Sequence, residues 1–321
     1  MRIGIMGAGG MGNVHARHYR ALGGVELVIF EPIEDRARQF ADVHHATVAQ
    51  SEDELFALAD AIDLCVPTDY HPECALKAIA AGRHVLVEKP IAKSLEEAGE
   101  VVKSADKAGV VLMVGQVVRY FPEFRKGHDL VAGGAIGKPA AARVRRGGGV
   151  PRAEWFLDHS RSGGVLVDLA VHDFDWLRWT LGEVDYLYSR SVGSSTMKGP
   201  DYALTTLSFD SGAVAHVEST WMDPSGFRVT FEVCGSDGMI EFDSRNTPAI
   251  RTHTAGGTRN ENPLAVVDDP YRNQLKDFIA ACRGEIAPPV SGYDGFMAVS
   301  IALAALESAK TGETVRPARE L

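Results

Sequence analysis

The first third of the chain alternates short apolar runs with longer segments that carry apolar residues at helical spacing. Short apolar runs of this kind are typical of buried strands. They lie at residues 2–6, 26–30, 46–48, 64–66, 84–88 and 111–114. Because the runs are apolar rather than alternating, they predict a parallel sheet covered by helices on both faces. Six such strands fit a Rossmann-type domain.

The helices expected between the later runs carry recognisable end signals. Ser94 can cap the helix that follows the fifth run, and Glu97 three residues later completes a capping box. The preceding helix is expected to end at Gly82, because glycine commonly follows the last helical turn. Both signals support the alternation of strands and helices.

The pattern changes after about Arg119, where Pro122 and two groups of glycines interrupt the earlier rhythm. From Asp185 onward, longer segments alternate polar and apolar residues. These expected strands lie at 186–192, 203–209, 213–220, 228–235 and 238–242, and helices are expected at 270–284 and 294–312. Such alternation predicts one packed face and one face that is free or covered by another subunit. We therefore expect two domains, 1–119 and 120–321.

Charge and cysteine content exclude several classes of partner. The formal net charge is −10, so nucleic acid is not an expected ligand. Four scattered cysteines without a Cys-x-x-Cys pair argue against a zinc site or a disulfide framework and fit a reducing cytoplasm. The chain enters a strand directly, with no signal-peptide pattern, and its longest apolar stretch is too short to span a bilayer. We expect a cytoplasmic protein with no metal, nucleic-acid or membrane partner.

A glycine motif follows the first expected strand. Gly7, Gly9 and Gly12 form G-x-G-x-x-G, with Gly10 and Met11 inside it. The first glycine permits a tight turn, the second lets a pyrophosphate approach the backbone, and the third lets helix and strand pack closely. The pyrophosphate would lie at the helix N-terminus, where free N–H groups and the helix dipole favour anions. The alternative is a glycine turn that binds no ligand.

An acidic residue ends the second expected strand. Glu31 lies nineteen positions after Gly12, about where a carboxylate binds the adenine-ribose hydroxyls of a dinucleotide. A carboxylate there repels a 2′-phosphate, which favours NAD over NADP. Arg36 and Arg38 lie close by and could instead accommodate NADP. The simpler alternative is that Glu31 only caps the loop before the next helix.

The fifth expected strand ends in Glu88, Lys89 and Pro90. Proline has no N–H for a sheet and disfavours helical geometry at the residue before it, so the strand stops there. Lys89 is therefore held at the carboxyl end of the strand, on the edge where open α/β sheets bind their ligands.

Asp168 and His172 form a second candidate pair, within an apolar segment that follows two glycines. They are four positions apart, so they share one face if the segment is a helix, whereas Asp173 and Asp175 point elsewhere. An aspartate beside a histidine can fix the tautomer of the ring and stabilise its charged form. A surface ion pair is the simpler alternative, but the apolar surroundings predict burial, and buried polar residues require a reason.

These motifs together resemble the glucose–fructose oxidoreductase / inositol dehydrogenase (Gfo/Idh/MocA) family. The glycine motif is followed by His15, "VPTDYHPECALKAIAAGRHVLVEKP" comes next, and "GGVLVDLAVHDFD" lies further on. The resemblance implies a Rossmann NAD-binding domain at 1–119. It also implies a substrate-binding and oligomerisation α/β domain at 120–321, with an open, mostly antiparallel mixed sheet. Members mostly oxidise a secondary alcohol of a sugar, sugar acid or cyclitol, and a homodimer or homotetramer is expected.

The resemblance also implies roles for individual residues. Lys89 reaches the reacting oxygen and stabilises its developing charge, and His172 accepts the hydroxyl proton while Asp168 orients it. The residues placed at the cofactor are Pro67, Thr68, His71, Glu88, Lys89 and Gln116, in addition to the glycine motif, Glu31 and Arg36. The residues placed at the substrate are Lys89, Arg119, Trp155, Asp168 and His172. Gln116 departs from the asparagine common in the family, and the Lys89–Pro90 bond is expected to be cis.

A basic segment leaves the substrate class open. It contains Arg143, Arg145, Arg146, Arg152 and Arg161. Arginine suits the recognition of a carboxylate, as in a sugar acid. Surface or interface ion pairs are the favoured interpretation, because charged runs are usually solvated.

Two other functions remain open at this point. A redox sensor would need the glycine loop and Glu31, but it would not need Lys89, Asp168 and His172 together. An NAD-dependent glycosidase similar to this family would turn over substrate without net release of NADH, whereas a dehydrogenase releases NADH in proportion to substrate.

Overall fold

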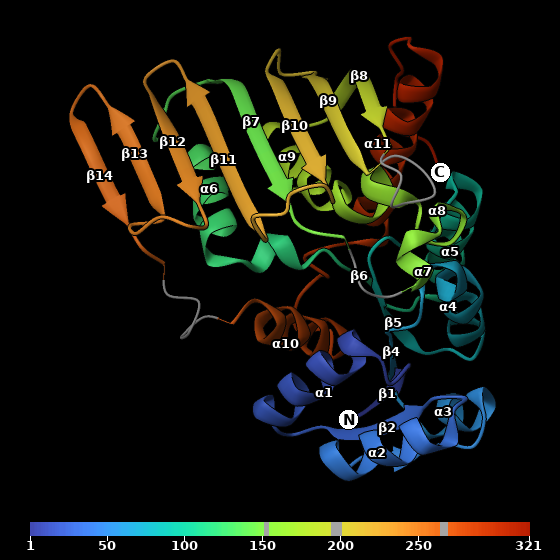
Figure 1. The fold of residues 1–321 in the computed structure, drawn as a ribbon. Coiled ribbons are helices and arrows are strands. Elements are labelled where there is room, and N and C mark those ends of the chain that lie inside the picture. The colour runs from blue at the N-terminus through green and yellow to red at the C-terminus, as the bar shows by residue number, and fades with distance from the viewer. Residues whose placement is uncertain (151–153, 194–200, 264–268) are drawn as a thin grey trace. The chain divides into compact units, whose positions relative to one another are not determined.

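The computed structural model describes the chain except for residues 151–153, 194–200 and 264–268, and it contains two compact units (Figure 1). Unit 1 comprises Met1–Val117, the described part of Asp268–Phe296, and Leu321. Unit 2 comprises the described parts of Val118–Val267 and Met297–Glu320. The expected boundary at residue 119 lies close to the observed one. Unit 1 also includes the described part of Asp268–Phe296, whereas residues 120–321 were expected to form one domain.

Unit 1 is built on a six-stranded parallel sheet with the order β3-β2-β1-β4-β5-β6. Its strands are β1 (Arg2–Met6), β2 (Glu26–Phe30), β3 (Thr47–Val48), β4 (Ala61–Leu64), β5 (His84–Glu88) and β6 (Leu112–Gly115). This order is that of the Rossmann fold, as expected. The expected strand at 64–66 is displaced from β4, because β4 contains the buried carboxylate of Asp63 and therefore does not read as an apolar run.

The helices of unit 1 follow the expected alternation. They are α1 (Gly10–Leu22), α2 (Glu34–His44), α3 (Glu52–Leu58), the short η1 (Thr68–Tyr70), α4 (His71–Ala80), α5 (Leu95–Ala108) and α10 (Pro270–Cys282). The capping prediction for α5 is confirmed, since Ser94 Oγ accepts the N–H of Glu97 at 3.2 Å. Helix α10 packs against α1, which is why the returning segment belongs to this unit.

Unit 2 is built on an open, eight-stranded mixed sheet with the order β14-β13-β12-β11-β7-β10-β9-β8. Its strands are β7 (Pro139–Gly147), β8 (Val184–Val192), β9 (Tyr202–Phe209), β10 (Val214–Thr220), β11 (Arg228–Gly235), β12 (Gly238–Asp243), β13 (Ile250–Thr254) and β14 (Gly257–Glu261). Strands β7 and β10 pair in parallel, and the other neighbours pair antiparallel, as expected. The sequence predictions missed β7, β13 and β14.

Helices cover one face of this sheet. They include α6 (Pro122–Ala132) and α9 (Val171–Leu181), which lie behind the strands in Figure 1. The remaining helical elements are η2 (Val117–Tyr120), α7 (Glu154–Leu157), α8 (His159–Ser162), the π-turn η3 (Val165–Leu169) and α11 (Gly292–Thr311). Phe124, Trp176 and Phe231 form an aromatic core between helices and sheet, with Trp176 edge-on to Phe124 at 5.2 Å between ring centroids. Among the described residues, no helix is both long and apolar enough to cross a membrane.

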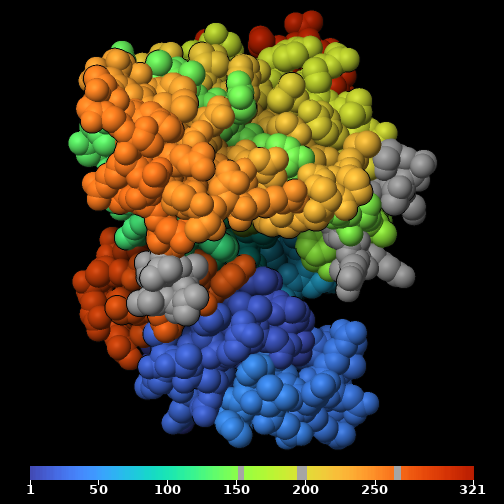
Figure 2. All heavy atoms as spheres, turned by 60° about the vertical axis from the view of Figure 1, so that its left-hand side comes forward, coloured from blue at the N-terminus to red at the C-terminus, as the bar shows by residue number. Residues whose placement is uncertain are grey.

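The opposite face of the sheet carries charged side chains that pair across strands. Arg143 lies 3.3 Å from Glu232, and Arg145 lies 3.1 Å from Glu218 and 2.7 Å from Asp223. Figure 2 shows this region of unit 2, where atoms of β7 (green) are visible among those of the neighbouring yellow and orange strands. The favoured interpretation of the basic segment, ion pairing on a strand face, therefore describes Arg143 and Arg145. Arg152 lies outside the described residues.

Arg146 points to the other face of β7, because side chains alternate along a strand. Its guanidinium makes a bidentate contact with Asp173 of α9, in which Nε and NH2 donate to the carboxylate at 2.8–3.1 Å. Both side chains are buried, with 7% and 0% of their surface exposed. The charges of Arg146 and Asp173 are therefore matched inside unit 2, and neither is available to a substrate.

We predict that Asp173→Ala destabilises the protein far more than Glu232→Ala. Removing one partner of a buried pair leaves the other charge unmatched, which costs about 3–5 kcal/mol. Glu232→Ala removes the partner of Arg143 on the exposed face, and the expected cost is below about 1 kcal/mol. The measurement is the free energy of unfolding in urea for the two variants and the wild type. Equal losses in both variants would contradict the assignment of Arg146–Asp173 as a buried pair.

Candidate active site

The loop between β1 and α1 has the shape expected of a dinucleotide site. Gly7 has φ of +102°, and a Cβ there would lie 2.8 Å from the carbonyl oxygen of Cys65. A Cβ at Gly12 would lie 2.1 Å from the carbonyl oxygen of Gly7. A Cβ at Gly9 or Gly10, in contrast, would meet nothing within 4 Å, and Gly9 offers α1 no side-chain cap. Gly9 and Gly10 therefore leave room for a pyrophosphate at the N-terminus of α1, whose first turn includes Met11.

Glu31 follows β2 and lies beside this loop. Its Oε2 accepts the N–H of Ala8 at 3.0 Å, and its Oε1 accepts the N–H of Ile33 at 3.2 Å. The carboxylate thus joins the second strand to the glycine loop, where the ribose of a dinucleotide is expected. On α2, Arg38 pairs with Glu34, and Arg36 is exposed. Arg38 thus has an acidic neighbour on the exposed face of α2.

The segment after β4 places Pro67, Thr68 and His71 at the same edge of the sheet. Thr68 and His71 are buried. The ring of His71 bridges two backbone carbonyl groups, with Nδ1 2.7 Å from the oxygen of Pro90 and Nε2 2.9 Å from that of Val66. Burial lowers the pKa of His71 below its usual value. Both ring nitrogens face carbonyl oxygens of the segments that follow β4 and β5, and a neutral ring, which has one N–H, donates to one of the two. The expected contact of His71 with a cofactor is not tested.

Strand β5 ends at Glu88, Lys89 follows it, and the Lys89–Pro90 bond is cis, as expected. Glu88 is buried, and its Oε2 accepts the N–H of Lys89 at 3.2 Å. Its Oε1 lies so close to the neighbouring strand β6 that a Cβ at Gly115 would be 2.8 Å away. Gln116, the residue after β6, is buried as well. Thus the carboxylate of Glu88 supports the backbone at Lys89, and its expected contact with a cofactor is not tested.

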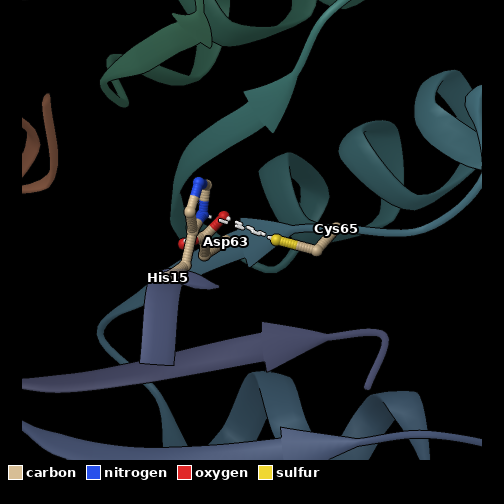
Figure 3. A group of neighbouring side chains, drawn as sticks. All are labelled: His15, Asp63 and Cys65. Carbon is tan, nitrogen blue, oxygen red and sulfur yellow. Dashed lines mark hydrogen bonds and ion pairs between the residues drawn. The ribbon is translucent and has the colours of Figure 1, made fainter. Parts of the chain in front are cut away.

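A buried polar cluster, which the sequence analysis missed, lies under this edge. His15 of α1, Asp63 of β4 and Cys65 point toward one another (Figure 3). Nδ1 of His15 lies 2.8 Å from Oδ2 of Asp63, and the Cys65 thiol donates to Oδ1 of Asp63 at 3.4 Å. Burial and Asp63 raise the pKa of that thiol. These residue types can bind metals, but a direct 2.8 Å contact is the length of a hydrogen bond, so the cluster is a hydrogen-bonded network.

Unit 2 contains the second candidate pair, but the continuous helix expected around it is interrupted. Asp168 belongs to the π-turn η3, and His172 lies in the first turn of α9, with Ala170 between the two elements. Asp168 is buried and His172 is half-buried. The expected four-residue spacing on a single α-helix is therefore corrected, because the chain is wound more widely at Asp168 than an α-helix is.

Two residues expected at the substrate have other contacts within unit 2. Arg119 donates from Nε and NH2 to Asp175 at 2.7 and 2.6 Å, and its guanidinium lies over Trp179 at 5.4 Å. This pair is buried, so Arg119 and Asp175 match each other as Arg146 and Asp173 do. Trp155 stacks on Phe156 at 3.9 Å between centroids. Neither contact supports the expected substrate roles of Arg119 and Trp155, which stay untested.

Comparison with known proteins extends this picture. The family model of the "Oxidoreductase family, NAD-binding Rossmann fold" matches residues 1–116, and that of the "GFO/IDH/MocA C-terminal domain" matches residues 124–241. Myo-inositol 2-dehydrogenase of Thermotoga maritima is 30% identical over 98% of each chain. 1,5-Anhydro-D-fructose reductase of Ensifer adhaerens is 34% identical over 79% of this chain and 78% of its own. The crystal structure of GenD2 from gentamicin A biosynthesis in complex with NAD has a TM-score of 0.88 and 26% identity, covering 98% of this chain and 96% of that one.

The glycine loop, the strand order and the matched family model define unit 1 as an NAD-binding Rossmann fold of an oxidoreductase. The chain belongs to the Gfo/Idh/MocA family. The residues of the loop fit the dinucleotide, since Gly9 and Gly10 leave space in front of the uncapped N-terminus of α1.

We predict that Glu31→Ala weakens NAD binding and lowers the preference for NAD over NADP. Charged hydrogen bonds contribute about 1.5–3 kcal/mol, so the dissociation constant for NAD should rise roughly tenfold to a hundredfold. Fluorescence titration with NAD and NADP measures both effects. Glu34→Ala is the matched control, because Glu34 lies three residues on and pairs with Arg38 on the surface. Wild-type protein that binds NADP as tightly as NAD would contradict the role given to Glu31.

Proposed function

We propose that the protein is an NAD-dependent dehydrogenase that oxidises a secondary alcohol of a cyclitol or sugar to the ketone. Two findings support this proposal: the family membership, and the position of Lys89 directly after β5, in the same unit and at the same sheet edge as the glycine loop after β1. When bound, NAD supplies a nicotinamide ring that accepts a hydride from the substrate carbon.

The protein's own side chains would manage the charge and the proton. Lys89 stabilises the negative charge that develops on the substrate oxygen, because a fixed positive charge acts most strongly where charge appears. His172 removes the hydroxyl proton as general base, and Asp168 orients its ring. These roles are carried from the family motif to the matching residues of this chain.

The charge distribution favours a neutral polyol over a sugar acid. Arg145, Arg146 and Arg119 each contact a carboxylate of the same unit, so none of these three offers an unmatched charge to an acidic substrate. The names of two similar proteins support the same choice, since one is named for inositol and the other for an anhydro sugar. We further propose a cytoplasmic location, which suits the four cysteines that are present as free thiols.

A substrate screen tests the proposed function directly. Purified protein with NAD is mixed in turn with cyclitols, neutral sugars and sugar acids, and NADH is followed by absorbance. We expect NADH to form in proportion to a cyclitol or neutral sugar. Turnover of a glycoside without net NADH would instead indicate the glycosidase chemistry, and NAD binding without any turnover would indicate a sensor.

We predict that Lys89→Ala leaves NAD binding within about threefold of the wild type while kcat falls about a hundredfold or more. Removing one preorganised group that stabilises an oxyanion has an effect of that size. The measurement pairs kcat with the dissociation constant for NAD. Lys103→Ala is the control, since Lys103 is an exposed lysine on α5. Wild-type kcat in Lys89→Ala would exclude Lys89 from the reaction.

We also propose that a second copy of the chain covers the outer face of the unit 2 sheet, giving a homodimer or homotetramer. That face exposes Leu204 and Val214 beside the paired charges, with 45% and 37% of their surface accessible.

We predict that Leu204→Glu shifts the protein to a smaller species in sedimentation at micromolar concentration. Val43→Glu, on the exposed side of α2, should leave the species unchanged. A wild-type monomer would contradict the proposal.

A further inference from the structure

His15 lies on α1, one turn beyond Gly12, and its side chain is fully buried. The two nitrogens of its ring face two different carboxylates. Nδ1 is 2.8 Å from Oδ2 of Asp63, and Nε2 is 3.3 Å from Oε1 of Glu88. One histidine therefore joins the helix of the glycine loop to β4 and to the end of β5.

The proton count of this arrangement favours a charged ring. A neutral imidazole has one N–H, so it can donate to only one of the two carboxylates, and its lone pair would face the other. An imidazolium carries an N–H on each nitrogen: Nδ1 hydrogen-bonds Asp63, and the charge on the ring also attracts Glu88, whose Oε1 lies at ion-pair distance from Nε2. Burial is the largest single influence and would lower the pKa of His15, but the polar neighbours together, Asp63 foremost, outweigh it and raise that pKa well above its usual value. The other groups that face the ring are the thiol of Cys65 and, at 6.2 Å between centroids, the ring of Tyr271 on α10.

Glu88 connects His15 to the backbone at Lys89. One oxygen of its carboxylate faces His15, and the other accepts the N–H of Lys89 at 3.2 Å. A Cβ at Gly115 of β6 would lie 2.8 Å from the first oxygen, so the glycine leaves the room that this oxygen occupies. The backbone at Lys89 is thus fixed by a carboxylate that is itself held by a buried cation.

We propose that His15 is a positioning residue for Lys89. As a buried imidazolium, His15 holds the carboxylate of Glu88, and Glu88 in turn holds the backbone N–H of Lys89. The inference rests on the proposed dehydrogenase function, and it assigns no contact between His15 and substrate or cofactor. Its consequence is that the helix carrying the pyrophosphate loop and the turn carrying the lysine are aligned by one charged side chain. A misplacement of a reacting group by about 1 Å can reduce a rate roughly a hundredfold.

The first test reads the ring directly and does not depend on turnover. In protein labelled with ¹³C-histidine, the His15 signal is assigned by its loss in His15→Gln. We expect this signal to keep the shift of an imidazolium at pH 8, where an exposed histidine is neutral, and to lose it in Asp63→Asn, which removes the carboxylate that raises the pKa of His15. A wild-type signal that titrates near pH 6.5 or below would overturn the proposal.

The second test separates positioning from general support of the fold. We measure kcat, the NAD dissociation constant and the melting temperature for His15→Gln, Glu88→Gln and the double variant. Each single change should lower kcat at least about tenfold while NAD binding stays within about threefold, and the double variant should be no worse than the more damaged single one. Additive losses, or a lower melting temperature with unchanged kcat, would overturn the proposal. Because glutamine has nearly the same shape as glutamate, Glu88→Gln still tests the proposal if His15→Gln does not fold.

His18→Gln is the matched control on the same helix. His18 stacks on Tyr271 and lies 3.6 Å from Asp269, so it packs beside His15 without reaching Glu88. We expect wild-type kcat for this variant, and a loss equal to that of His15→Gln would overturn the proposal. If the wild type oxidises no polyol, the proposed function fails, and the ¹³C-histidine spectra still decide whether His15 is the buried cation held by Glu88.

Discussion

Unit 1 depends on the close approach of α1 to the parallel sheet. A Cβ at Gly12 would lie 2.1 Å from the carbonyl oxygen of Gly7, so only glycine allows the helix to lie this near the first turn. The same approach opens the N-terminus of α1 toward a pyrophosphate and carries His15, one turn later, between Asp63 and Glu88. The binding loop and the support of Lys89 are therefore consequences of one packing contact.

Unit 2 depends on a different constraint, the matching of buried charges. Arg146 and Arg119 lie in the interior and would be strongly unfavourable there without partners. Asp173 and Asp175 provide these partners from α9, which fixes the helix against β7 and η2. Because side chains alternate along β7, the neighbouring Arg145 points outward and pairs on the opposite face. A run of arginines that looks uniform in the sequence is thus divided between a core and a surface.

The sequence predicted those features that are set by neighbouring residues. Strands β1, β2 and β5 were predicted at their observed positions, because each is a continuous apolar run between polar residues. It failed where a buried charge interrupts the pattern, as with Asp63 in β4 and Arg146 in β7. The His15 cluster could not be foreseen, since its members are brought together only by the sheet order. The break before His172 was missed because a π-turn leaves no mark on the spacing of apolar residues.

Two histidines of unit 1, His15 and His71, explain why a flexible lysine can serve as a fixed charge. Lysine has a long side chain with many rotamers, and ordering it costs conformational entropy. Its backbone is held from both sides here, by Glu88 at the N–H of Lys89 and by His71 at the carbonyl oxygen of Pro90. A charge that is already placed needs little reorganisation during the reaction, and that preorganisation is what stabilises a developing oxyanion.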